Sequence, residues 1–167
     1  MPKDPRRQLQ GRMAKAIGQR FESRLDNSFD YYSQRGFAEV EKTPEPMSPI
    51  KNLGNGKFLA IFRKKAQVDY KGTVKGGRSV LFEAKFTTTD RIEQSRVGET
   101  QSDYMKRHSA LGARCFVIVG FSSGNVYRIP WEVWVRMKEQ FGRKYVMEAD
   151  LKLYLVPVGW NGTLQLF

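Results

Sequence analysis

The sequence predicts a mixed α/β domain in which a central mixed β-sheet is flanked by helices and carries a protruding stalk insertion. Three observations lead to this class. Apolar residues recur at helical spacing near the N-terminus, apolar runs of strand length surround a helical segment in the second half, and a Pro- and Gly-rich stretch interrupts the pattern at residues 43–57. A chain of 167 residues is most simply one domain with room for a substantial core.

Charge and cysteine content indicate the class of partner. The chain has 29 Lys and Arg residues against 17 Asp and Glu residues, a net charge of +12 that favours polyanions. No apolar run approaches the ~20 residues that cross a bilayer, so nucleic acid is favoured over a membrane. The single cysteine, Cys115, excludes an intramolecular disulfide and a cysteine-based zinc cluster. Because the N-terminus also lacks the apolar segment of a signal peptide, we expect a reduced, cytoplasmic protein.

The N-terminal third is expected to hold a basic arm and a helix. Residues 1–10 are predicted to be a flexible basic arm, and residues 11–167 to be the folded domain. A helix ending near Gly36 is indicated by an apolar stripe with helical spacing: Met13, Ile17, Phe21, Leu25 and Phe29.

The segment after this helix predicts a strand and then an excursion from the core. Residues 37–42 (FAEVEK) alternate apolar and polar, as a strand does. The stalk insertion, about residues 43–60, is rich in Pro and Gly, turns at Asn55-Gly56 and returns as a strand at residues 58–62. Long insertions of this kind in compact domains are usually functional.

The second half predicts a hairpin, two helices and a central strand. Residues 67–72 and 78–86 are typical of two hairpin strands, and residues 87–98 of a polar loop. A helix is expected next, with Thr100 as its N-cap and Gly112 as its stop. The remaining predicted elements are strands at 113–121 and 125–130 and a helix at 131–142.

The strand at residues 78–86 carries charges where a buried strand is normally apolar. Alternation places Glu83 and Lys85 on one face, opposite Val80, Phe82, Ala84 and Phe86. Asp69, on the preceding strand, can reach the same edge. Two converging carboxylates repel each other unless a cation lies between them, and Mg²⁺ takes a few oxygen ligands while keeping waters or substrate phosphate. With a lysine to stabilise charge in the transition state, this arrangement suits phosphodiester hydrolysis.

An ordinary alternative is an exposed strand face with a Glu–Lys ion pair and a nearby aspartate, because Glu-x-Lys is a common sequence. The context favours the functional interpretation. The three charged residues follow a basic insertion and precede a predicted helix that carries Gln101, where this side chain can face the same pocket.

These motifs resemble a known family. Asp69, the segment FEAK at 82–85 and Gln101 in the next helix resemble the Asp…Glu-x-Lys core of the restriction-endonuclease-like nucleases. Over roughly residues 11–135, the chain is more closely similar to the RecU family of Holliday junction resolvases. The segments that carry this similarity are GQRFESRLDNSFDYY, VDYKGTVKGGRSVLFEAKFT, QSDYMKRHSALGARCFVIVGF and YRIPW.

The resemblance implies a restriction-endonuclease-like core and a magnesium-dependent endonuclease that cuts four-way DNA junctions as a homodimer, with Mn²⁺ able to replace Mg²⁺. It implies three magnesium ligands: Asp69, Glu83 and Gln101. Lys85 matches the family's transition-state stabiliser, and Glu22 matches a first-helix glutamate near the site. The family places a threonine ligand two residues before the aspartate, where this sequence has Gln67, so that ligand position is open.

Basic residues in and after the insertion are candidates for contacts with DNA phosphates, although a solvated charged run is the ordinary alternative. These candidates are Lys51, Lys57, Arg63, Lys64 and Lys65. By resemblance, the stalk would enter the open centre of a junction. Two other functions stay open: a nuclease of the same core acting on other DNA, and a non-catalytic DNA-binding accessory protein. We expect no membrane partner and no small-molecule cofactor, and the sequence does not distinguish a chromosomal from a phage origin.

Overall fold

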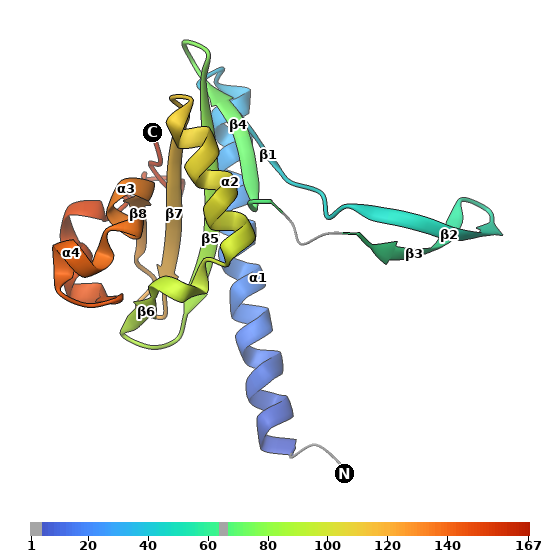
Figure 1. The fold of residues 1–167 in the computed structure, drawn as a ribbon, viewed down its shortest axis with the longest axis horizontal. Helices are drawn as coiled ribbons and strands as arrows, with labels where there is room; N and C mark the ends of the chain where they lie inside the picture. The colour runs from blue at the N-terminus through green and yellow to red at the C-terminus, as the bar shows by residue number, and fades with distance from the viewer. Residues whose placement is uncertain (1–4, 64–66) are drawn as a thin grey trace.

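The computed structural model describes residues 5–63 and 67–167 and is built around a five-stranded mixed sheet (Figure 1). The sheet contains, in spatial order, β1 (Ala38–Lys42), β4 (Tyr70–Val74), β5 (Arg78–Thr87), β7 (Arg114–Phe121) and β8 (Val126–Pro130). Only β5 and β7 are parallel, and α2 (Glu99–Ala110) lies between them in the chain as the crossover that parallel strands require. The predicted mixed α/β class with a central mixed sheet is confirmed.

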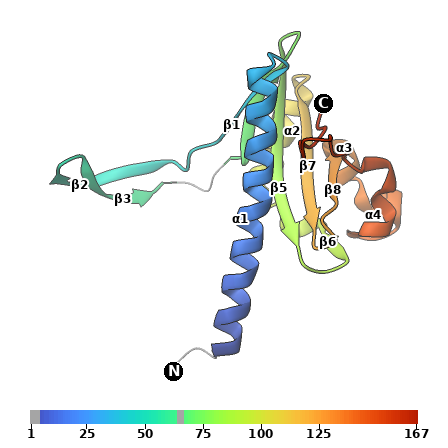
Figure 2. The ribbon, with the colours of Figure 1, turned by 180° about the vertical axis from the view of Figure 1, so that it is seen from behind.

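Helices cover both faces of the sheet (Figures 1 and 2). The long helix α1 (Pro5–Gln34) packs on one face, while α2, α3 (Trp131–Val135) and α4 (Met137–Phe141) pack on the other. In β5, Val80 and Phe82 belong to the core under α1, and Leu81 belongs to the core under α2. The predicted alternation of this strand is therefore confirmed.

Helix α1 begins earlier than expected. The flexible arm predicted for residues 1–10 differs from the structure, in which the helix starts at Pro5; residues 1–4 lie outside the described residues. Proline is tolerated in a first helical turn, and the Arg and Gln residues that follow favour helix. Among the side chains that the structure describes, Phe21 is the first in α1 to be buried, and Leu9 and Met13 are exposed. The first half of α1 therefore extends beyond the sheet (Figure 2).

The predicted stalk is a separate two-stranded sheet that projects from the main sheet (Figure 1). Its strands are β2 (Met47–Gly54) and β3 (Lys57–Phe62), and they are joined by the predicted turn at Asn55-Gly56, where both residues have positive φ. At its base the backbone N–H of Arg63 donates to the carbonyl of Pro46 at 3.0 Å. The protruding insertion is confirmed.

The surface of the stalk is unusually apolar. Alternating side chains of β3 leave apolar groups on both of its faces. Seven large apolar side chains of the stalk are each more than 50% exposed: Met47, Ile50, Leu53, Phe58, Leu59, Ile61 and Phe62. A two-stranded sheet with this composition is at best marginally stable without a covering partner.

One expected loop contains a strand. The polar loop predicted at residues 87–98 is wrong in part, because β6 (Arg91–Glu93) pairs there with β9 (Tyr145–Met147). Ile92 is buried between two charged neighbours, and its partner strand lies far along the chain, so local sequence gave little sign of the pairing. Two short 3₁₀ helices complete the fold: Gln94–Arg96 and Glu148–Tyr154.

The helix predicted at residues 131–142 is divided into α3 and α4 at Arg136, whose φ of −98° and ψ of 22° leave the helical region. The N-cap of α2 is Gly98 and not the predicted Thr100. No helix in the described part of the chain is long and apolar enough to span a membrane.

Candidate active site

Asp69 and Glu83 meet at the point where the chain enters β4. Tyr70 in β4 pairs with Phe82 in β5, so one step further along the register Asp69 lies across from Glu83. The Asp69 Oδ2 accepts a hydrogen bond of 2.9 Å from the backbone N–H of Ala84, which fixes this carboxylate beside β5. The structure thus brings together the two predicted carboxylates.

The Glu83 carboxylate is fully buried, and only one of its oxygens has partners. Lys85 Nζ donates to Glu83 Oε1 at 2.5 Å, and Gln101 Nε2 donates to the same oxygen at 2.6 Å. Glu83 Oε2 is buried and has no hydrogen-bond partner among the residues that the structure describes. Burial, assisted by the charge of Asp69 and opposed by Lys85, raises the pKa of Glu83 to about 7.

This donor set fits a hard divalent cation. A buried carboxylate oxygen without a partner is normally explained by a missing water or ion, and a cation there would also offset the repulsion between Asp69 and Glu83. Within residues 5–63 and 67–167, no group of three or more His, Cys, Asp or Glu side chains could hold a metal. Two carboxylates would therefore need neutral oxygens, water or substrate phosphate to complete the shell, which is the usual pattern for Mg²⁺.

Gln101 reaches the site, but through its amide nitrogen. It lies in the first turn of α2, where its Oε1 accepts a hydrogen bond of 3.0 Å from the backbone N–H of Gly98. Its Nε2 is thereby directed at Glu83. In this orientation Gln101 positions the glutamate, and its oxygen would reach a cation only after the amide turned over.

Gln67 and Glu22, the other predicted site residues, have partners of their own. Gln67 is exposed, and its Oε1 accepts a hydrogen bond of 3.2 Å from Lys71 Nζ. Glu22 forms an ion pair with Lys42. No hydrogen bond joins Gln67 or Glu22 to Asp69 or Glu83 in the described part of the chain.

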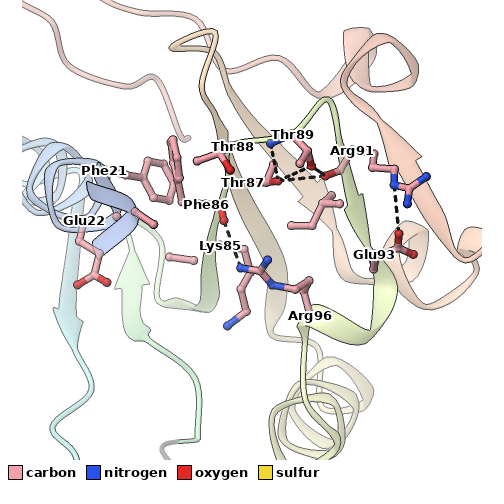
Figure 3. Close-up of a pocket in the computed structure, with 14 residues that line it drawn as sticks. Phe21, Glu22, Lys85, Phe86, Thr87, Thr88, Thr89, Arg91, Glu93 and Arg96 are labelled. Atoms are coloured by element: carbon pink, nitrogen blue, oxygen red, sulfur yellow. Dashed lines mark hydrogen bonds and ion pairs between the residues drawn. The ribbon is translucent and has the colours of Figure 1, made fainter. Parts of the chain in front are cut away.

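A cleft of about 630 Å³ adjoins the site between α1 and the end of β5 (Figure 3). Glu22 lines the cleft from α1, and Lys85 lines it from β5. Glu22 is therefore connected to the site as part of the wall of this shared cleft. Arg96 lines it from the opposite side, with its Nη2 donating to the Phe86 carbonyl at 3.2 Å. Hydroxyl groups at residues 87–89 add polar lining. Sequence reasoning missed Arg96, because it lay in a segment predicted to be a loop.

The predicted DNA-binding residues that the structure describes do not line this cleft. Lys51 and Lys57 are exposed on the stalk, and Arg63 is exposed at its base. Lys64 and Lys65 lie outside the described residues. Lys51 and Lys57, on the projecting stalk (Figure 1), are therefore on a different part of the molecule from Asp69 and Glu83.

Comparison with known proteins gives a consistent result. The family model described as RecU, Recombination protein U, matches residues 16–165. The protein named Holliday junction resolvase RecU from Bacillus pumilus (strain SAFR-032) is 32% identical over 145 residues, which are 80% of this chain and 69% of that protein. Its namesake from Streptococcus gordonii is 31% identical over 112 residues, 64% of this chain and 56% of that protein.

Among solved structures, the chain is similar to Hjc from Archaeoglobus fulgidus, described as a Holliday junction resolvase from an archaeal hyperthermophile. The TM-score is 0.45 at 11% identity, covering 78% of this chain and 92% of that one.

Proposed function

Since this chain belongs to the RecU family, we propose that it is an endodeoxyribonuclease that selects and resolves four-way DNA junctions in recombination and repair. One observation carries the proposal: a fully buried glutamate, held by a lysine and a glutamine beside an aspartate, keeps one oxygen without a partner among the described residues. Such an arrangement is costly for stability, and a cation that binds phosphate explains why it is kept. A DNA substrate and the free, buried Cys115 both suit action in the cytoplasm.

We propose that Asp69 and Glu83 hold one Mg²⁺, or Mn²⁺ in its place, and that Gln101 joins them by turning its amide oxygen away from Gly98. When bound, the ion would supply positive charge to phosphate oxygens and lower the pKa of water. Lys85 Nζ, fixed at Glu83, would stabilise the negative charge that develops on the phosphorus oxygens. Among the described residues Glu22 has no hydrogen bond to Asp69 or Glu83, and its proposed contribution is limited to the wall of the cleft.

The cleft supports a path for the cut strand. Arg96 and the hydroxyl groups of residues 87–89 can contact backbone phosphates on the approach to Lys85. These contacts carry no sequence information, which suits an enzyme that recognises the shape of its substrate.

We propose that the enzyme acts as a homodimer whose subunits meet at the stalk. Resolution requires nicks in two strands at symmetric positions, and one site per chain supplies these only in a twofold assembly. The exposed apolar side chains of β2 and β3 are what a second copy would bury. Lys51 and Lys57 would then face the DNA at the centre of the junction.

The test is cleavage of a mobile four-way junction against linear duplex of the same sequence, with and without Mg²⁺. We expect cleavage of the junction only with the metal, at symmetric positions. Glu83→Gln should lower the rate by about a hundredfold or more, because it removes a charged ligand while keeping the shape. Its junction affinity should be equal to or higher than that of the wild type, since negative charge near the phosphates is lost.

The other outcomes distinguish the alternatives. Equal cleavage of junction and duplex would indicate a nuclease of the same core that acts on other DNA. Junction binding without cleavage at any metal concentration would indicate a non-catalytic accessory protein. Wild-type cleavage by Glu83→Gln would contradict the metal site.

A further inference from the structure

Thr43, the residue that follows β1, stands in line with Asp69 and Glu83. Lys42 in β1 pairs with Tyr70 in β4, and the next step is marked by a hydrogen bond of 2.8 Å from the Thr43 N–H to the Asp69 carbonyl. Asp69 in turn lies across from Glu83. Directly opposite residues of antiparallel strands project from the same face of a sheet. Extending the register by one step therefore places these three residues in a row across three adjacent segments of the chain.

The Thr43 hydroxyl is buried and without a partner. Thr43 Oγ1 and Glu83 Oε2 are two of only three buried side-chain polar atoms in residues 5–63 and 67–167 that have no hydrogen-bond partner. They do not hydrogen-bond each other, although they belong to the same row. Leaving a hydroxyl buried and unpaired destabilises the folded state, so each such atom calls for an explanation.

A cation at Asp69, the middle member of the row, would give both atoms a partner, directly or through a bound water. The carboxylates of Asp69 and Glu83 are too few to complete the shell of a hard cation, and a threonine hydroxyl is a neutral oxygen of the kind that remains to be supplied. Gln101 and Gln67 both have their amide oxygens engaged elsewhere, with Gly98 and Lys71. Thr43 offers an unengaged oxygen without any rearrangement of its partners.

We propose that Thr43 Oγ1 is a further oxygen donor of the metal site, directed at the ion or at a water held by it. This inference rests on the proposed metal site at Asp69 and Glu83. It assigns the role to a residue at the root of the stalk, separated from Asp69 by the whole insertion in sequence and adjacent to it in space.

The experiment measures Mn²⁺ binding to the full chain without DNA, by calorimetry, together with thermal unfolding in a chelator. Thr43→Val removes the hydroxyl and keeps the branched shape, Thr43→Ser keeps the hydroxyl, and Thr73→Val is the matched control on an exposed position of β4. We expect Thr43→Val to weaken Mn²⁺ binding by about tenfold, and the other two variants to bind as the wild type does.

The metal-free Tm adds a second criterion. Because the hydroxyl has no partner in the part of the chain that the structure describes, Thr43→Val should leave the metal-free Tm unchanged or higher. A lower Tm would mean that the hydroxyl has a structural partner and would overturn the inference, as would unchanged Mn²⁺ affinity. If the wild type itself binds no Mn²⁺, the proposed metal site fails and Thr43 loses its role with it. If the wild type binds Mn²⁺ and Thr43→Val binds equally well, only the role of Thr43 fails.

Discussion

Among single residues, Glu83 shows most clearly how the fold is arranged for chemistry. Its neighbours in β5 are apolar, and a valine or isoleucine there would stabilise the strand without any need for a partner. Instead the carboxylate is buried, and Lys85 and Gln101 satisfy only one of its oxygens. Glu83 therefore lowers the stability of the metal-free protein, and binding of a cation would restore that stability.

The stability of the metal-free protein should accordingly depend on pH through Glu83. Its pKa is raised from 4.5 to about 7. Between these two pH values, the folded state therefore holds a proton on Glu83 that the unfolded state has released. The stabilisation is complete below about pH 4.5 and is lost as the pH rises through about 7, at about 1.4 kcal/mol per pKa unit. We expect the Tm in a chelator to fall between pH 5 and pH 8 relative to that of Glu83→Gln, which has no such proton.

Saturating Mg²⁺ should restore most of this loss at pH 8 in the wild type and should raise the Tm of Glu83→Gln only slightly. Parallel Tm curves for the two proteins in chelator would show that Glu83 titrates as an ordinary exposed carboxylate, contrary to its burial.

The carboxylates could be predicted from the sequence because strand alternation is a local property. Glu83 and Lys85 are two residues apart on one strand, and Asp69 lies immediately before the strand paired with it. The orientation of the Gln101 amide could not be predicted, since it depends on the backbone of Gly98. Thr43 was missed because its place beside Asp69 is set by pairing across the whole insertion.

At the level of elements, the stalk combines two surface properties that separate variants can distinguish. Its apolar side chains suit contact with a second copy, and Lys51 and Lys57 suit contact with DNA. In β3, Phe58 and Phe62 project from one face, and Phe62 pairs with Met47 of β2. Lys51 pairs with Leu59 on the other face.

We expect Phe58→Ser with Phe62→Ser to shift the protein from dimer to monomer at micromolar concentration, measured by analytical ultracentrifugation. Lys51→Ala with Lys57→Ala should leave the dimer intact and weaken junction binding by roughly tenfold, with a smaller effect on linear duplex. Mn²⁺ affinity serves as the control and should be unchanged in both variants, because the metal site lies outside the stalk. A monomeric lysine variant, or a dimeric serine variant, would contradict this division of roles.

Elements with a strong local pattern were predicted, and those fixed by distant partners were not. The turn at Asn55-Gly56 and the central strand β7 follow from turn chemistry and a continuous apolar run. Strand β6 exists only because β9 pairs with it from the C-terminal part of the chain. The helical residues 5–10 of α1 were missed because basic residues without an apolar stripe can also belong to an arm.

For the molecule as a whole, charge should govern affinity for DNA. The net charge is +12, and the helical residues of α1 before Glu22 include no acidic side chain. That part of α1 carries five basic residues: Arg6, Arg7, Arg12, Lys15 and Arg20. A protein that contacts several phosphates releases as many counterions, so its affinity falls steeply with salt.

We expect junction affinity in Ca²⁺, which limits cleavage, to fall about a thousandfold between roughly 50 and 200 mM NaCl. Fluorescence anisotropy with a labelled four-way junction would measure this slope, and linear duplex would serve as the comparison. A flat response would mean that affinity comes from the apolar stalk and not from the basic surface.

The way the stalk is inserted has a mechanical consequence. The stalk is inserted between Thr43 and Asp69, two residues of the row that includes Glu83, and the Thr43 N–H donates to the Asp69 carbonyl. A tilt of the stalk relative to the main sheet would therefore change the spacing between the side-chain oxygens of Thr43 and Asp69. Binding of a well-fitting DNA to the stalk would then also set the geometry of the proposed metal ligands. A DNA that fits the stalk poorly would leave the site without that geometry, and it would not be cut.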